Sequence, residues 1–231
     1  MSLNIDKLRA LTLDLDDTLW PIWPTIERAE SVLLAWLQRH APRVTERFDG
    51  VAMRSVREAV ARERPEWAHD LGRLRRESIR RLLVAADEDE ALADAAFEVF
   101  LAERQRVDLY ADTLPALRRL AARWPLFALS NGNADLERIG IRRWFSGSLA
   151  ARELGIGKPD GRIFAAACER LDCLPQEVLH VGDDLALDVH GALDAGLQAA
   201  WLRRDGGHDA AVAARCWQGR DLLALADRLG V

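Results

Sequence analysis

The spacing of apolar and polar residues changes twice along the chain. Short apolar runs that end abruptly in polar residues are typical of buried strands, and they predict strands at 8–15, 125–130, 177–182 and 198–202. Between about 25 and 107 the apolar residues recur instead at helical spacing, as in Val32, Leu33, Trp36 and Leu37. This middle segment predicts helices at 25–40, 44–63, 67–86 and 89–106. Further helices are predicted at 114–123, 162–171, 186–195 and 220–229.

Strands that alternate with helices predict a parallel sheet. We therefore expect the α/β class, with a Rossmann-like parallel sheet core and helices on both of its faces. The all-helical segment interrupts this alternation once, directly after the first strand. The expected domains are a core of residues 1–22 and 108–231 and a helical insertion of residues 23–107.

Composition narrows the classes of partner. The 231 residues are 49% hydrophobic, which can supply a core, and the net charge of −5 gives no case for nucleic-acid binding. The longest apolar runs fall well short of the ~20 residues of a membrane span, and the first residues lack the apolar core of a signal peptide. Three cysteines without zinc-ligand spacing suggest free thiols. We expect a cytoplasmic monomer or dimer with no nucleic-acid or membrane partner.

Three acids stand within four residues at the end of the first predicted strand: Asp14, Asp16 and Asp17. Carboxylates crowded at a strand end repel one another and are costly to desolvate. A divalent cation bound by their oxygens offsets that cost. The first strand therefore predicts a metal-binding turn.

Three further polar motifs fit the same site. They are Ser130-Asn131-Gly132-Asn133, Gly157-Lys158-Pro159-Asp160, and Gly182-Asp183-Asp184 with Asp188. Ligands of open α/β sheets bind at the carboxyl ends of the strands, so we expect these motifs to converge there.

The basic residues point to one lysine. Of the 32 basic residues, Lys7 and Lys158 are the only lysines. A compact ammonium fits a tight anion site where a broad guanidinium cannot. The choice of lysine at 158 therefore favours a functional position.

The four motifs, in this order, resemble those of the haloacid dehalogenase (HAD) superfamily, specifically its aspartate-nucleophile phosphatases. The resemblance spans most of the chain. It implies Mg²⁺-dependent hydrolysis of a small-molecule phosphate ester through a phospho-aspartate intermediate. It also implies that the helical insertion is a C1 cap, a lid that excludes water and selects the substrate.

Carried onto this sequence, the resemblance makes Asp14 the nucleophile and Asp16 the general acid and then base. Mg²⁺ would be held by Asp14, Asp183 and the backbone carbonyl of Asp16. Lys158 would neutralise both Asp14 and the phosphate. Phosphate oxygens would bind Ser130, Asn131, Gly132 and Lys158. Asp184 and Asp188 would complete the acidic cluster, with Asp188 holding either a metal-bound water or Lys158.

One segment of the helical insertion indicates a particular branch of the superfamily. The segment Pro65-Glu66-Trp67-Ala68-His69-Asp70 resembles a bacterial branch that acts on flavin mononucleotide and on 5-amino-6-(5-phosphoribitylamino)uracil, a riboflavin precursor. Substrate-selecting side chains would then be Trp67, His69, Arg73 and Arg76. The alternative for this arginine-rich stretch is a solvated helix face.

Two other functions remain open. A 2-haloacid dehalogenase would share the fold and Asp14 but needs no metal. Asp16, as the proton donor for a leaving alkoxide, argues against this function. The other function is non-enzymatic: the protein would be a phospho-acceptor receiver domain or a catalytically dead interaction protein. Receiver domains lack a large helical insertion, and a dead enzyme should have lost at least one motif residue.

Overall fold

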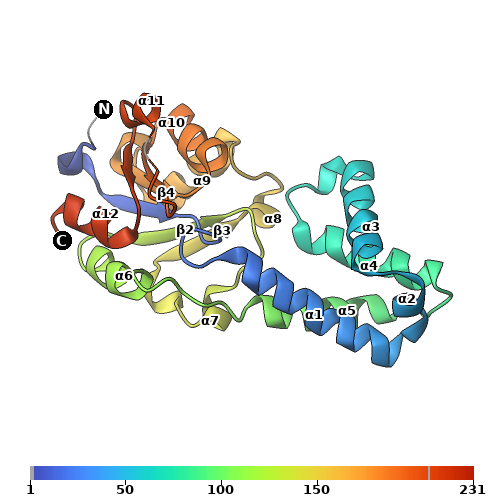
Figure 1. The fold of residues 1–231 in the computed structure, drawn as a ribbon. Helices are drawn as coiled ribbons and strands as arrows, with labels where there is room; N and C mark the ends of the chain where they lie inside the picture. The colour runs from blue at the N-terminus through green and yellow to red at the C-terminus, as the bar shows by residue number, and fades with distance from the viewer. Residues whose placement is uncertain (1–2, 208) are drawn as a thin grey trace. The chain divides into compact units, whose positions relative to one another are not determined.

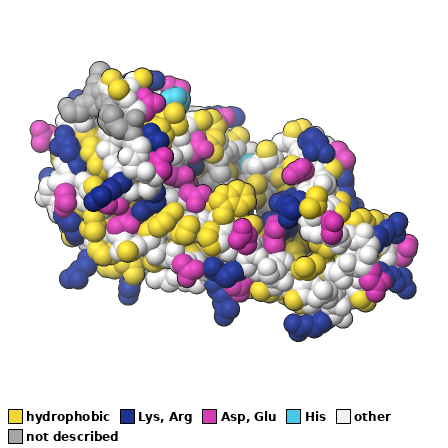
Figure 2. Space-filling view, in the orientation of Figure 1, with side chains coloured by type: hydrophobic (Ala, Val, Ile, Leu, Met, Phe, Trp, Pro, Cys, Tyr) yellow, Lys and Arg dark blue, Asp and Glu magenta, His cyan; other side chains and the backbone are white. Residues whose placement is uncertain are grey.

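The computed structural model describes residues 3–207 and 209–231 (Figure 1). The chain divides into two compact units. The core unit comprises Met1–Pro21 and Asp108–Val231, and the insertion unit comprises Ile22–Val107. Among the described residues, no helix is long and apolar enough to cross a membrane. Figure 2 shows acidic and basic side chains interspersed over the visible face.

A six-stranded sheet organises the core unit, in the order β3-β2-β1-β4-β5-β6. All neighbouring strands pair in parallel. The strands are β1 (Ala10–Leu13), β2 (Leu126–Ser130), β3 (Gly147–Ala150), β4 (Val178–Gly182), β5 (Gln198–Leu202) and β6 (Trp217–Gly219). The predicted α/β class with an all-helical insertion after the first strand is confirmed.

Helices cover both faces of this sheet. Figure 1 shows α9 (Gly161–Leu171) and α10 (Gly191–Asp194) on one side, and α6 (Thr113–Ala121) and α12 (Leu222–Leu229) on the other. The remaining helical segments of the core unit are short: η1 (Ile5–Lys7), α7 (Leu136–Ile139), η3 (Arg142–Trp144), α8 (Ala151–Leu154), η4 (Pro175–Glu177), the π-helical turn η5 (Leu185–His190) and α11 (Ala210–Ala213).

The strands β1, β2 and β4 are buried along their whole length, which explains their continuous apolar runs. Their register places Leu13 of β1 beside Ala128 of β2 and Val181 of β4. The carboxyl ends of these central strands therefore lie side by side.

The insertion unit is wholly helical. It contains α1 (Ile22–His40), α2 (Pro42–Arg47), α3 (Gly50–Glu63), η2 (Pro65–Trp67), α4 (Leu71–Ala85) and α5 (Leu92–Arg104). Its own hydrophobic cluster includes Leu37, Leu83 and Phe100. The continuous helix predicted over 44–63 is wrong, because the chain breaks at Phe48 and restarts where Asp49 caps α3 by accepting from the Ala52 amide at 2.8 Å.

Candidate active site

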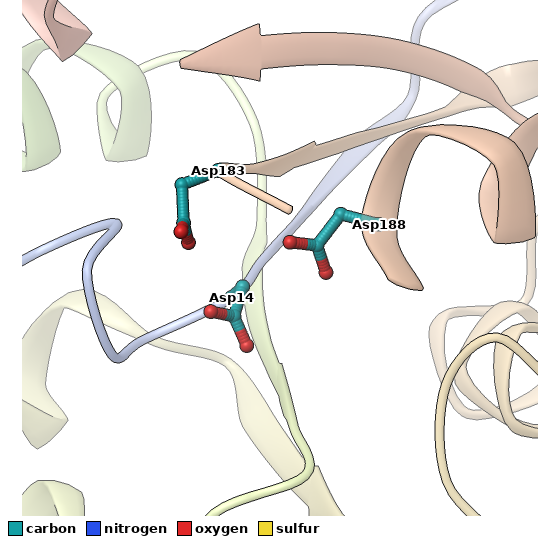
Figure 3. Close-up of side chains that lie close together, drawn as sticks. All are labelled: Asp14, Asp183 and Asp188. Carbon is teal, nitrogen blue, oxygen red and sulfur yellow. The ribbon is translucent and has the colours of Figure 1, made fainter. Parts of the chain in front are cut away.

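Three carboxylates meet at the carboxyl ends of β1 and β4. Asp14 follows β1 and Asp183 follows β4, and the pairing of these two strands makes the two residues neighbours. Asp188 reaches the same place from the π-helical turn η5. Figure 3 shows the three side chains grouped, and one oxygen of each lies within 4.8 Å of the others.

The turn that delivers Asp188 depends on two local features. Asp184 caps it by accepting from the amides of Ala186 and Leu187, both at 2.8 Å. A Cβ at Gly182 would lie 2.3 Å from the Asp188 carboxyl carbon, so only glycine admits this approach. The observed contacts of Asp184 are thus those of a loop-forming residue.

Lys158 supplies the buried positive charge of the site. Its Nζ donates to Asp14 Oδ1 at 2.6 Å and to Asp188 Oδ1 at 2.5 Å. Its side chain is only 2% exposed, which excludes competition from bulk solvent. Lys158 therefore ties the carboxylate after β1 to the one from η5.

Asn131 holds the loop that carries Lys158. Its Nδ2 donates to the Lys158 carbonyl at 2.9 Å, and its Oδ1 accepts from the Lys158 amide at 2.8 Å. Ser130 Oγ accepts from the Gly132 amide at 2.9 Å. The direct phosphate contacts expected of Ser130, Asn131 and Gly132 stay predictions, but both ends of the Asn131 amide already position Lys158.

A buried series of hydrogen bonds connects Thr12 through His180 to Asp188, and it was not predicted from the sequence. His180 of β4 lies 3.1 Å from Asp188 Oδ1 through Nε2 and 2.9 Å from Thr12 Oγ1 through Nδ1. Burial lowers the pKa of His180, although Asp188 opposes the shift. The imidazole is therefore neutral, with Nε2 donating to the Asp188 carboxylate and Nδ1 accepting from Thr12.

His180→Phe should lower kcat about tenfold, the order expected from losing one hydrogen bond to a charged group. Phenylalanine keeps an aromatic ring beside Phe164, whose centroid lies 5.1 Å from that of His180, but Asp188 loses a donor. Thr12→Val removes the hydroxyl one step further from Asp188 and should cost less. Steady-state kinetics with thermal unfolding as a fold control measures both. An unchanged kcat in His180→Phe would show that the hydrogen bonds from Thr12 through His180 to Asp188 serve only the packing of β4.

The carboxylates of the site are unequally ionised. Burial raises the pKa of Asp14 well above its ordinary value, although Lys158 opposes the shift. Burial also opposes ionisation of Asp188, but Lys158 and His180 outweigh it and hold the pKa of Asp188 below its usual range. Burial and the Asp188 carboxylate raise the pKa of Asp183 to about 7.

This donor set fits a divalent cation. Three carboxyl groups face one ammonium and a neutral imidazole, so Lys158 can offset only one of the negative charges they would carry, and burial together with this excess raises the pKa of Asp14 and Asp183. Oxygen donors of this kind suit Mg²⁺, which binds through one or two carboxylates and keeps several waters. Asp14 and Asp183 are the residues that would hold it. Both oxygens of Asp188 already have partners, Lys158 and His180 on Oδ1 and the Asp184 amide on Oδ2, whereas Lys158 contacts Asp14 through Oδ1.

Asp16 lies in a closed turn after β1. Its Oδ1 accepts from the indole Nε1 of the fully buried Trp20 at 2.9 Å. The Asp17 amide donates to the Trp20 carbonyl at 2.8 Å, and Asp17 has a left-handed backbone with φ of 57°. Asp14 and Asp16 thus have different partners, which allows two nearby carboxyl groups to take different roles.

A hydrogen bond connects this turn to the acidic cluster. Thr18 Oγ1 donates to Asp183 Oδ1 at 2.9 Å. The Asp183 carbonyl in turn accepts from Trp201 Nε1 at 2.7 Å. The turn after β1 and the loop after β4 are therefore held together.

The predicted substrate-selecting residues all belong to the insertion unit. The Trp67 ring carries the guanidinium of Arg73 at 4.0 Å and that of Arg64 at 5.1 Å from its centroid. Arg76 pairs with Asp94 at 2.7 Å and lies over Phe97. Trp67, Arg73 and Arg76 thus have partners within the insertion, and their role toward a substrate stays a prediction, as does that of His69.

Known proteins are similar to this chain in sequence and in fold. The family model of haloacid dehalogenase-like hydrolases matches residues 8–196. The 5-amino-6-(5-phospho-D-ribitylamino)uracil phosphatase YigB of Escherichia coli is 38% identical over 207 residues, covering 88% of this chain and 87% of that protein. A phosphoserine phosphatase of Thermus thermophilus is 33% identical, covering 85% and 89%. A 2-haloacid dehalogenase from Pseudomonas syringae pv. Tomato, known from its crystal structure, is 34% identical in sequence and superposes with a TM-score of 0.90. The match covers 96% of this chain and 98% of that one.

Proposed function

Because the chain belongs to the family of haloacid dehalogenase-like hydrolases, we propose that it is a magnesium-dependent phosphatase acting through Asp14. One observation carries the proposal. Asp14, Asp183 and Asp188 together can carry more negative charge than Lys158 can balance. A divalent cation would neutralise that excess, and the phosphate of a substrate would then bind to the cation and to Lys158.

The residues divide the reaction into two steps. An oxygen of the Asp14 carboxylate attacks phosphorus, and the bond to the leaving alcohol breaks, which gives an acyl phosphate. Asp16 protonates the departing oxygen and then takes a proton from water, whose oxygen attacks phosphorus and regenerates Asp14. Lys158 holds Asp14 in place and offsets the phosphate charge. Mg²⁺, when bound, would polarise a phosphoryl oxygen.

The proposed substrate is 5-amino-6-(5-phosphoribitylamino)uracil or flavin mononucleotide. Its support is the 38% identity with the Escherichia coli phosphatase over most of both chains. Both molecules present a flat heterocycle on a ribityl phosphate, so one arrangement of side chains could bind either.

The second candidate is haloacid dehalogenation, favoured by the 34% identity and TM-score of 0.90 to the Pseudomonas syringae protein. A screen decides between the two: phosphate release from phosphate esters with Mg²⁺, and halide release from 2-haloacids. We expect phosphate release, with the ribityl phosphates ranked first by kcat/KM. Halide release that continues in chelator would contradict the proposal.

The magnesium requirement should depend on pH. Because the pKa of Asp183 is raised to about 7 without metal, a proton competes with Mg²⁺ below that pH. The half-saturating Mg²⁺ concentration should rise as the pH falls from about 8 to about 6. Asp183→Asn should raise it at least about tenfold at neutral pH, since a charged ligand is lost. Titrations of activity with Mg²⁺ test both, and a requirement that is flat with pH would count against Asp183 as a ligand.

Insertion residues should affect substrates unequally if they select the substrate. Trp67→Ala or His69→Ala should lower kcat/KM for flavin mononucleotide about fivefold, as expected for roughly 1 kcal/mol of lost ring contact. The small ester p-nitrophenyl phosphate, which lacks the heterocycle, is the matched control and should be hydrolysed at nearly the original rate. Equal losses on both substrates would mean that these residues serve only the insertion's packing.

A further inference from the structure

The insertion unit holds a cavity of its own, of about 300 Å³, between α1, α3 and α4. The helices pack in the sequence α1 on α5, α5 on α4 and α4 on α3. In the part of the chain that the structure describes, the backbones of α1 and α3 do not pack closely against each other. The cavity lies between these two helices, and the side chains of Glu30 and Arg57 bridge them. Every lining residue belongs to Ile22–Val107, so the cavity shares no residue with the acidic site of the core unit.

Apolar surface makes up most of its wall. Leu33, Leu37, Ile79 and Leu82 are buried members of the insertion's hydrophobic cluster. Leu34 is 37% exposed, an accessible apolar side chain at the edge. The volume lies at the lower end of the ~300–1,000 Å³ range of small-molecule pockets. The wall therefore suits a compact apolar body.

Charged side chains from three helices meet at one place on this wall. Glu30 of α1 accepts from Arg57 of α3 at 2.6 Å and from Arg75 of α4 at 3.4 Å. Arg75 is only 14% exposed, and its guanidinium carbon lies 3.7 Å from the Phe100 ring centroid. Two guanidiniums thus share a single carboxylate.

Because Arg57 and Arg75 share the Glu30 carboxylate, one positive charge at this place is not neutralised. Burial and the neighbouring Arg57 lower the pKa of Arg75 to about 10, because Glu30 cannot offset both arginines. Arg54 is a third lining arginine and forms no ion pair with any described residue. With Glu27 and Glu30 as the lining acids, the wall carries one positive charge in excess.

We propose that this cavity binds a small amphipathic anion, an apolar or aromatic body that carries a single carboxylate, sulfonate or phosphate group. The body packs against the leucines of α1 and the apolar side chains of α4. The anionic group pairs with Arg54 and Arg57, which supply donors that Glu30 leaves unused. Charge-assisted pairing of guanidinium with such groups gives both affinity and orientation.

The binding test uses 8-anilinonaphthalene-1-sulfonate, an aromatic body with one sulfonate that fluoresces when it leaves water. The intact 231-residue chain should bind one equivalent saturably. Its neutral analogue N-phenyl-1-naphthylamine, which lacks the sulfonate, should bind at least about tenfold more weakly, as the loss of a charge-assisted hydrogen bond implies.

Two variants locate the site. Arg57→Gln removes a partly exposed charge and should weaken sulfonate binding about tenfold, whereas Arg152→Gln, the same change on an exposed core-unit helix, should not. Leu34→Glu places a negative charge at the edge and should abolish binding while circular dichroism stays unchanged. The proposal is overturned by the absence of saturable binding, by equal binding of the neutral analogue, or by Arg57→Gln and Leu34→Glu both binding like Arg152→Gln.

Discussion

The Asp14→Asn protein should fold normally and lose measurable turnover. An amide cannot attack phosphorus, so the acyl phosphate does not form, and removing a covalent nucleophile costs many orders of magnitude in rate. Stability should change little, because the buried Asp14 carboxyl already has a raised pKa and the amide is nearly isosteric. Lys158 retains Asp188 as its ionised partner at 2.5 Å.

Phosphate release by Asp14→Asn is compared with the wild type in preparations that have similar thermal unfolding. Near-normal release from a clean preparation would remove Asp14 from the mechanism. Partial activity that grows on storage would indicate deamidation back to aspartate, and mass spectrometry of the sample separates that case from true turnover.

Lys158→Arg should also lose most of its activity, by at least about a hundredfold, although it keeps the charge. The Nζ atom lies between two carboxylate oxygens at 2.6 and 2.5 Å in a pocket that leaves the side chain 2% exposed. A planar guanidinium is too broad for that position and would displace Asp14 or Asp188.

The chain provides its own control for this substitution. Lys7 is the other lysine and is exposed, so Lys7→Arg makes the same change away from the site and should have the wild-type rate. A wild-type rate in Lys158→Arg as well would mean that any positive charge suffices there and that the rarity of lysine in this chain carried no information.

The central sheet could be predicted because its strands are buried on both faces. β1, β2, β4 and β5 are runs of apolar residues that end in motif residues or turns. The edge strands β3 and β6 were not predicted, because Gly147–Ala150 and Trp217–Gly219 are short, partly exposed and contain glycine. Nothing in their residue pattern separates them from loops.

The candidate site could be predicted where polar residues end an apolar run, as Asp14 and Asp183 do, and at Lys158 because lysine is rare in this chain. The structure brings Asp14 and Asp183 together with Asp188 and places Lys158 on Asp14. His180 gave no such signal, since it is a single polar residue within a buried strand. Its role depends on the pairing of β4 with β1, which sets Thr12 beside it.

The break between α2 and α3 shows a different limit. Residues 44–63 carry helical spacing throughout, yet Phe48 has an extended backbone and Asp49 caps a new helix. Asp49-Gly50 is a recognisable turn signal and aspartate is a preferred helix N-cap, but the periodic pattern alone favours continuity. Local capping decided the outcome.

The central claim is that Asp14 becomes phosphorylated during turnover. The most direct test is to mix the enzyme and Mg²⁺ with a substrate that carries radiolabelled phosphate, quench in acid within the first turnover, and map the labelled peptide. We predict label on the peptide that contains Asp14, released by hydroxylamine as an acyl phosphate is, and no label in Asp14→Asn. Phosphate release without any labelled protein, or label on another residue, would contradict the account.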